Sequence, residues 1–144
     1  MTVIAWDGKT LAADRRSCYG QMINTITKIH RINGLLVGGS GDSAHVNEMI
    51  EWVRAGRKPE SFPDFQRSKD DWQPLLVIEL DGTPSLYERT PHPVRYEQPF
   101  ASIGSGREFA RAAMHLGKTA REAVELACAL DSACGNGIDE LAFQ

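Results

Sequence analysis

Three dipeptides that favour tight turns separate short apolar runs, and they constrain the fold more than any other feature of the sequence. Asp7-Gly8, Asn33-Gly34 and Asp81-Gly82 each lie between two strand-like segments. Because Gly accepts the positive φ that a two-residue hairpin turn requires, each dipeptide predicts two adjacent antiparallel strands. The six expected strands cover residues 3–6, 9–14, 27–32, 35–39, 75–80 and 85–88.

A first helix is expected after the Gly-rich stretch "GGSGDS". Apolar residues at Val46, Met49, Ile50 and Val53 fall at helical spacing. Asp42 or Ser43 can cap the free N–H groups at its start, and Gly56 can end it. The segment therefore predicts one amphipathic helix between the second and third hairpins.

Two further helices are expected near the C-terminus. The segment 107–117 places Phe109, Ala112, Ala113 and Leu116 on one face, and we expect that face to be buried. Thr119 and Glu122 have the spacing of a capping box and open a helix over 120–130. A last short segment, 137–143, has enough apolar residues to close a sheet edge, whereas the Pro-containing stretch 57–74 indicates a surface excursion.

The order of strands and helices predicts an α+β fold in which helices cover the outer faces of packed antiparallel sheets. A chain of 144 residues with 42% hydrophobic residues is long enough for one core, so we expect a single domain over 1–144. The net charge of −3 gives no basic excess and argues against nucleic acid as a partner. No apolar run approaches the roughly 20 residues that span a bilayer and no signal sequence is evident, so we expect a cytoplasmic protein without a membrane partner.

The cysteines and histidines give no sign of a metal or a disulfide framework. Cys18, Cys128 and Cys134 have neither zinc-ribbon nor disulfide spacing, and we expect them to be reduced and mostly buried. The four histidines lack metal-ligand spacing such as HExxH. No metal site and no cofactor are therefore expected.

Thr2 is the first candidate for chemistry. Removal of Met1, which is general before a small residue, would leave a threonine whose free α-amine lies beside its own hydroxyl. An α-amine has a pKa of about 7.7–8.0, so near neutrality it can accept the hydroxyl proton and activate the residue as a nucleophile. The alternative is that Met-Thr is simply an efficiently processed start.

Four further motifs are individually weak. Asp14, beside two arginines, could be one member of a solvated ion pair, and Lys28 could be an ordinary surface lysine. Glycines between a strand and a helix in "VGGSGDS" can direct backbone N–H groups at a developing negative charge, or simply form a tight turn. "IGSGREF" repeats that arrangement and exposes Ser105, while "LDSACG" places an aspartate against the dipole at a helix C-terminus.

Taken in order along the chain, "GKTLAAD", "TKI", "GGSGD", "IGSG" and "DSACG" after an early threonine resemble the β-type proteasome subunits, and above all the HslV-type threonine peptidases. The resemblance extends over nearly the whole chain apart from roughly residues 57–74. It implies the N-terminal nucleophile (Ntn) hydrolase fold, a four-layer αββα sandwich of two antiparallel sheets. The Pro-containing stretch replaces most of the second helix of the family, so a shortened first helix layer is expected.

The resemblance also implies a role for each motif. Thr2 would be the nucleophile and its amine the general base, with Lys28 held by Asp14 close by. The remaining roles are an oxyanion N–H from Gly38, a substrate groove at Gly39 and Ser40, hydrogen bonds near the amine from Ser105 and Asp131, and a supporting rather than nucleophilic Cys134.

The activity implied by the resemblance is hydrolysis of peptides or unfolded proteins inside a self-compartmentalising homo-oligomeric ring, with an AAA+ ATPase unfoldase as a possible partner. Two other functions stay open. One is a catalytically silent structural ring subunit, which would retain Met1. The other is a small-molecule amidase of the same nucleophile type, because a fold does not determine its substrate.

Overall fold

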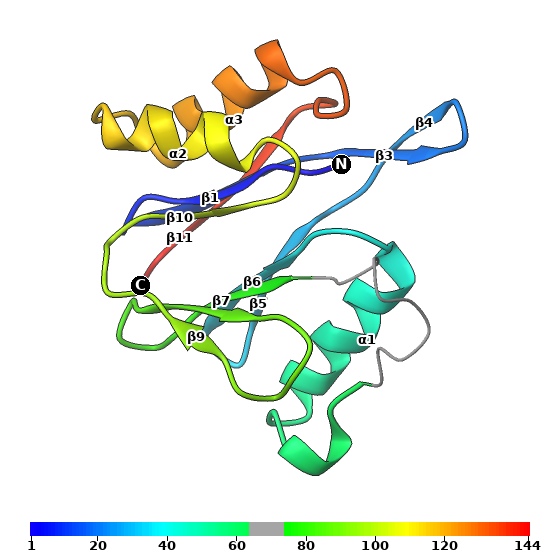
Figure 1. Ribbon diagram of the computed structural model, residues 1–144, viewed down its shortest axis with the longest axis vertical. Helices are drawn as coiled ribbons and strands as arrows, with labels where there is room; N and C mark the ends of the chain where they lie inside the picture. The colour runs from blue at the N-terminus through cyan, green and yellow to red at the C-terminus, as the bar shows by residue number, and fades with distance from the viewer. Residues whose placement is uncertain (64–73) are drawn as a thin grey trace.

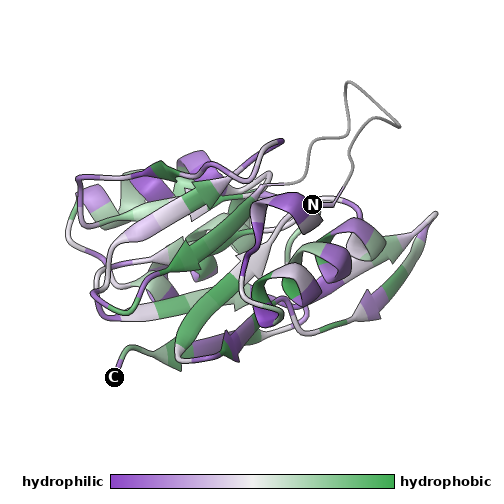
Figure 2. Cartoon of the chain, turned by 90° about the horizontal axis from the view of Figure 1, so that it is seen from below, coloured by the Kyte–Doolittle hydropathy of each residue, from purple (hydrophilic) through white to green (hydrophobic). Residues whose placement is uncertain are grey.

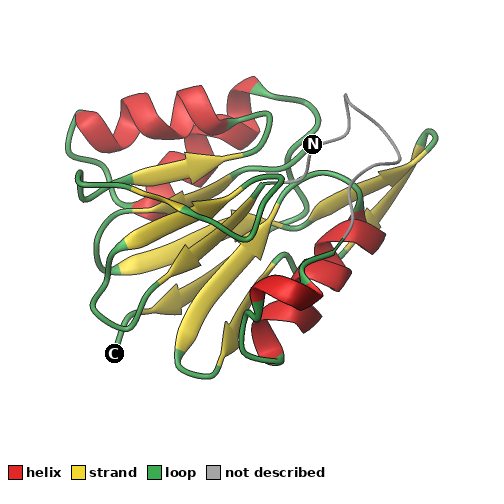
Figure 3. Cartoon of the chain, turned by 60° about the horizontal axis from the view of Figure 1, so that its bottom comes forward, coloured by secondary structure: helices red, strands yellow, loops and turns green. Residues whose placement is uncertain are grey.

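Four layers of secondary structure stack on one another in the computed structural model, which describes residues 1–63 and 74–144 (Figure 1; Figure 3). Two helices cover a sheet of four strands, that sheet packs on a second sheet of five strands, and one helix covers the far side. This arrangement confirms the predicted αββα sandwich. Residues 64–73, the larger part of the predicted surface excursion, lie outside the described residues.

The first sheet has the strand order β10-β1-β2-β11, with every neighbouring pair antiparallel. Its strands are β1 (Ile4–Trp6), β2 (Thr10–Asp14), β10 (Ala101–Ile103) and β11 (Ile138–Ala142). Strands β1 and β2 form the hairpin predicted around Asp7-Gly8, and β11 forms the predicted sheet edge beside β2. The C-terminal strand thus lies next to the beginning of the chain.

The second sheet has the strand order β5-β6-β7-β8-β9, again antiparallel throughout. Its strands are β5 (Ile29–Ile32), β6 (Leu35–Gly39), β7 (Leu75–Ile78), β8 (Pro84–Tyr87) and β9 (Val94–Arg95). Asn33 and Gly34 both have positive φ, 52° and 80°, as a type I′ turn requires. The two hairpins predicted from Asn33-Gly34 and Asp81-Gly82 are confirmed.

A separate hairpin of β3 (Arg16–Tyr19) and β4 (Met22–Thr25) extends away from the two packed sheets (Figure 3). No sequence signal had marked these residues as strands. All four residues of β4 are exposed, so the hairpin lacks the buried face that produces a recognisable alternation. Cys18 lies on it and is exposed, which contradicts the prediction that the cysteines are mostly buried.

Alternation along the strands separates the apolar residues into three cores. On β1 and just before it, Val3 and Ala5 face the helices whereas Ile4 and Trp6 face the second sheet. Figure 2 shows the apolar segments concentrated on the strands inside the sandwich. The core between the sheets is formed by Ile4, Trp6, Leu11, Ile29, Leu36, Leu76, Ile78 and Leu86, among others.

Helix α1 (Ser43–Arg54) covers the outer face of the second sheet, as predicted. The Asp42 side chain caps it by accepting a hydrogen bond of 2.8 Å from the Ala44 N–H. Its buried residues are Met49, Ile50, Trp52 and Val53. After α1 the described chain has only a short 3₁₀ turn, η1 (Pro59–Ser61), before the residues that are not described.

Helices α2 (Arg107–His115) and α3 (Ala120–Leu130) cover the first sheet, and the predicted capping box of Thr119 and Glu122 is present. The apolar face predicted for α2 is buried only in part, at Ala113. The buried residues of the helix are Ala110, Ala113 and Met114, while Phe109 is 39% exposed and Leu116 is 80% exposed.

The close approach of α2 to the sheet explains this difference. A Cβ added to Gly106, directly before the helix, would lie 3.0 Å from side-chain carbons of Val3 and Ala127. Ala110 and Ala113 therefore occupy the inner face together with Met114, whereas Phe109 and Leu116 turn outward. Hydropathy alone could not distinguish the two faces, because both carry alanine.

None of the helices in the described part of the chain is long and apolar enough to cross a membrane.

Candidate active site

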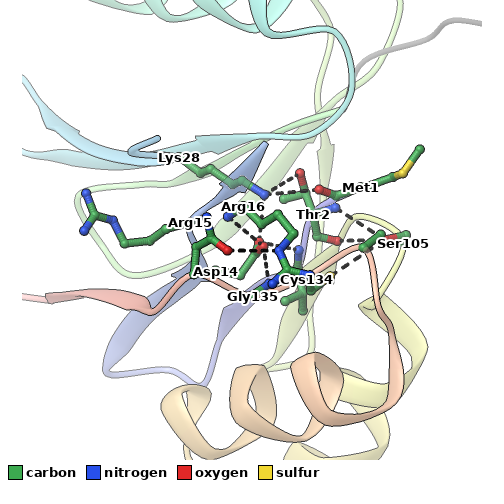
Figure 4. Close-up of polar contacts among 12 residues, drawn as sticks. Met1, Thr2, Asp14, Arg15, Arg16, Lys28, Ser105, Cys134 and Gly135 are labelled. Atoms are coloured by element: carbon green, nitrogen blue, oxygen red, sulfur yellow. Dashed lines mark hydrogen bonds and ion pairs between the residues drawn. The ribbon is translucent and has the colours of Figure 1, made fainter. Parts of the chain in front are cut away.

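Thr2 is buried, with an exposed fraction of 5%, at the end of the sandwich where β1 begins. The Lys28 Nζ lies 3.2 Å from the Thr2 hydroxyl oxygen and 3.1 Å from the Met1 carbonyl oxygen (Figure 4). Met1 is attached to Thr2 here, so the Thr2 nitrogen is an amide N–H. An ammonium group thus faces the hydroxyl of the predicted nucleophile.

Asp14 holds Lys28 in this position. Its Oδ1 lies 2.8 Å from the Lys28 Nζ, and both side chains are buried, 0% and 4% exposed. Three backbone N–H groups also donate to the same carboxylate, each at 3.1 Å: those of Val3, Arg16 and Gly135. The solvated ion pair and the surface lysine that the sequence left open are therefore both excluded.

Ser105 and Asp131 approach Thr2 from the other side. The Thr2 N–H donates to the Ser105 Oγ at 3.3 Å, and the Ser105 hydroxyl donates to Asp131 Oδ2 at 2.7 Å. Asp131 follows the last residue of α3 and also accepts the Ala133 N–H at 2.9 Å. The hydrogen bond from Ser105, followed by that from the Ala133 N–H, lowers the pKa of Asp131, so its carboxylate stays ionised near neutrality.

Cys134 lies beside this pair. It is 2% exposed, and its Sγ is 3.5 Å from Asp131 Oδ2 and 3.9 Å from the Ser105 Oγ. Burial raises the pKa of its thiol to about 12. A thiol that stays protonated near neutral pH is a poor nucleophile, so the geometry favours a packing and hydrogen-bonding role for Cys134.

The backbone N–H groups of two adjacent glycines on β6, Gly38 and Gly39, point to opposite sides of the strand. The Ser40 N–H donates to the Pro74 carbonyl at 3.1 Å, and N–H groups alternate sides along an antiparallel strand. The register therefore directs the Gly38 N–H to β7, opposite Leu76, and the Gly39 N–H to the other side, just beyond the end of β5. Thr2 and Gly39, but not Gly38, line a common small cavity of about 40 Å³.

The register therefore favours Gly39 over Gly38 as an N–H donor near Thr2. A Cβ at Gly38 would meet Ile4 and Ile29 at 2.9 Å, so this residue faces the core between the sheets. Gly39 is the residue whose N–H is directed toward the Thr2 side of the sheet. Ser40, expected in a substrate groove, is 8% exposed and lines a separate, larger cavity with Ser105.

Two residues that hold the site together were missed by the sequence reasoning. Gly104 has φ +97°, and a Cβ there would overlap the Thr2 carbonyl group. Arg16 donates to the Ser132 carbonyl at 2.7 Å and to Asn136 Oδ1 at 3.0 Å, which fixes the loop after α3. The glycine in "IGSG" was a signal for the first, but nothing in the sequence indicated the second.

Groups of three or more His, Cys, Asp or Glu side chains suited to a metal ion do not occur among the described residues.

Comparison with known proteins gives one sequence relative and several structural ones. No protein-family model matches the chain. Proteasome subunit beta 2 of Pyrococcus abyssi (strain GE5 / Orsay) is 29% identical over 129 residues, which cover 75% of this chain and 62% of that protein. The chain thus spans less than two thirds of the length of this curated relative.

Solved structures match over almost the full length of the described fold. Thiobacillus denitrificans BPH in complex with epoxomicin has a TM-score of 0.76 at 15% identity, covering 100% of this chain and 98% of that chain. Eukaryotic HslV from Trypanosoma brucei has a TM-score of 0.69 at 21% identity, covering 99% and 98%. These likenesses confirm the predicted Ntn-hydrolase fold, and together with the archaeal relative they confirm the predicted resemblance to β-type proteasome subunits and HslV.

Proposed function

We propose that this protein is a threonine-type peptidase in which Thr2, once Met1 is removed, attacks a peptide carbonyl. The observation that carries the proposal is the position of Thr2 between two polar groups. The Lys28 Nζ lies 3.2 Å from its hydroxyl oxygen, and the Ser105 Oγ lies 3.3 Å from its nitrogen. A hydroxyl beside a cation and an amine beside a hydrogen-bonded serine are the groups that nucleophilic catalysis by a terminal threonine requires.

The first step would form a tetrahedral intermediate. The Thr2 amine accepts the hydroxyl proton through a water molecule while the Thr2 Oγ bonds to the carbonyl carbon of the substrate. The Lys28 ammonium stabilises negative charge on the attacking oxygen and disfavours protonation of the amine before the attack. The Gly39 N–H, directed toward this side of the sheet, donates to the oxyanion, and losing such a donor typically slows a reaction about 10²–10³-fold.

The second step would release both products. The protonated amine gives its proton to the leaving nitrogen as the carbon–nitrogen bond breaks, which leaves an acyl ester on Thr2. Water then attacks the ester, the amine accepts its proton, and the acid product leaves with the hydroxyl restored. Ser105 and Asp131 keep the amine oriented through both transfers, since the serine hydroxyl is itself held at 2.7 Å by the carboxylate.

Peptides or unfolded polypeptides are the proposed substrates, bound in an extended conformation beside Gly39 and Gly41. Gly41 lines the same small cavity as Thr2 and Lys28, so a substrate strand next to these residues would reach the nucleophile. Assembly into a homo-oligomeric ring in the cytoplasm, with an AAA+ ATPase as unfoldase, completes the proposal. It is supported by the similarity to a protein named as a proteasome subunit.

The test combines mass and activity measurements on the purified chain. Intact mass spectrometry should show loss of Met1, and a peptide epoxyketone should add once to Thr2. Hydrolysis of quenched peptides should fall about 10³-fold or more in Thr2→Ala, whereas Thr2→Ser, which keeps a hydroxyl and an amine, should retain measurable turnover.

Two outcomes would favour the other functions. Retained Met1 in an assembled oligomer that does not react with the epoxyketone would indicate a structural subunit. Reaction with the probe and hydrolysis of small amides but not of peptides would indicate an amidase. Undiminished peptide hydrolysis by Thr2→Ala would refute the proposed nucleophile.

A further inference from the structure

A large cavity lies on the Ser105 side of Thr2 and is not used by the proposed steps. Its volume is about 530 Å³, within the range of roughly 300–1,000 Å³ typical of ligand sites. It is formed between β8, β10 and the loop that follows β8. The residues used below include Leu86, Glu88, Tyr96, Ser102, Ser105 and Arg107, all of which line it.

Thr2 and Lys28 line two cavities, of about 40 and 300 Å³, whereas the large cavity is lined by Gly104 and Ser105 but not by Thr2 itself. Lys28, whose Nζ contacts the Thr2 hydroxyl, lines the small cavity with Gly39. Ser105, whose Oγ accepts the Thr2 N–H, lines the large cavity. The small cavity is thus on the hydroxyl side of Thr2, and the large one is on the nitrogen side.

In the proposed reaction, the two sides of Thr2 face different parts of the substrate. The bond to the leaving nitrogen breaks as that nitrogen receives a proton from the Thr2 amine. The leaving nitrogen must therefore lie next to the Thr2 nitrogen and hence toward Ser105. Residues that precede the cleaved bond remain attached to the Thr2 oxygen as the ester, on the other side.

We propose that the 530 Å³ cavity binds the side chains of the substrate residues that follow the cleaved bond. This inference rests on the proposed function and extends it to a part of the substrate that the ester does not contain. Ser105 lines the cavity and contacts the Thr2 nitrogen at 3.3 Å, so this cavity is adjacent to the side of Thr2 from which the leaving nitrogen departs.

The walls of the cavity indicate which residues it accepts. Leu86 is buried in the core between the sheets, and Tyr96 packs against the same core. Burial and the Glu88 carboxylate raise the pKa of Tyr96, so the phenol stays a neutral hydroxyl. An apolar or aromatic residue after the cleaved bond fits the walls formed by Leu86 and Tyr96, whereas an aspartate would lose hydration against Leu86. Glu88 would repel its carboxylate, and Arg107, which also lines the cavity, would offset part of that repulsion.

The experiment uses internally quenched peptides that differ only in the residue after the cleaved bond, Leu or Asp, with the cleavage position verified by mass spectrometry. The expected kcat/KM ratio is about tenfold or more in favour of Leu. In Glu88→Lys the Asp peptide should improve relative to Leu by several-fold. Glu97→Lys is the matched control, because Glu97 is an exposed glutamate just after β9 that does not line the cavity.

A second variant fills the cavity. Ser102→Trp should lower kcat/KM for the Leu peptide about tenfold while epoxyketone labelling of Thr2 proceeds at the wild-type rate. The probe carries no peptide after its reactive group, so labelling reports the nucleophile alone.

The outcomes separate the two proposals. Absence of both labelling and hydrolysis in the wild type would refute the proposed function. Normal labelling with equal cleavage of the two peptides would refute the cavity assignment. A Ser102→Trp variant that loses labelling and hydrolysis equally, together with unchanged selectivity in Glu88→Lys, would refute it as well.

Discussion

The loss of folding stability should depend strongly on which partner of the ion pair between Asp14 and Lys28 is removed. Replacing Asp14 by Ala leaves the Lys28 ammonium, 4% exposed, without its carboxylate, and it also removes the acceptor of three backbone N–H groups. Removing one partner of a buried pair typically costs about 3–5 kcal/mol. The additional N–H groups place Asp14→Ala at or above the upper end of that range.

Replacing Lys28 by Met should cost less. The Asp14 carboxylate keeps its three hydrogen bonds from backbone N–H groups, which are the partners that stabilise a buried carboxylate. Met also fills most of the volume of the lysine stem with an apolar chain. We expect a loss below about 3 kcal/mol, and a double variant that is less damaged than the sum of the single variants.

Urea unfolding at a fixed protein concentration measures these differences, because an oligomer would make the midpoint depend on concentration. Asp139→Ala is the control, since its pair with Arg15 is about one third exposed on both sides and should contribute at most about 1 kcal/mol. A Lys28→Met variant less stable than Asp14→Ala would refute the reasoning. Both variants should lose epoxyketone labelling of Thr2, whatever their stability.

Three further predictions follow from the site. Gly104→Ala should abolish peptide hydrolysis and lower the melting temperature, because the φ of +97° is strained for Ala and the new Cβ would overlap the Thr2 carbonyl; calorimetry and a turnover assay measure both. Asp131→Asn should be less stable than the wild type above about pH 4, and the difference should vanish as the pH falls through the lowered pKa of Asp131, since a depressed carboxyl pKa stabilises only the ionised form; thermal unfolding between pH 3 and pH 7 tests this. Iodoacetamide at pH 8 should alkylate exposed Cys18 and leave Cys134 unmodified, because burial raises the pKa of Cys134 to about 12; peptide mapping by mass spectrometry distinguishes them, and modification of both at equal rates would contradict the burial.

The sequence predicted those parts of the fold that local rules determine. Turn chemistry at Asp7-Gly8 and Asn33-Gly34 located hairpins, and the capping box at Thr119 located a helix start. The rotation of α2 about its own axis was not predictable, because it depends on how closely Gly106 brings the helix to the sheet. The exposed hairpin of β3 and β4 was missed for the related reason that it has no buried face.

For the candidate site, it was easier to predict which residues take part than in which direction their backbone N–H groups point. Order along the chain drew attention to Lys28 and Ser105, and the structure brings both within hydrogen-bond distance of Thr2. The choice between Gly38 and Gly39 depends on which side of β6 each N–H faces, and a shift of one residue reverses it. Strand register is set by pairing with β5 and β7, which no single segment of sequence contains.

The groups that bind the Asp14 carboxylate come from both ends of the polypeptide. Val3 and Lys28 are near its start, whereas Gly135 lies 121 positions beyond Asp14. A chain emerging from the ribosome therefore has the threonine long before it has the surroundings that would make the threonine reactive. Under the proposed function, Thr2 becomes reactive only after the segment that contains Gly135 has been synthesised and has folded against Asp14.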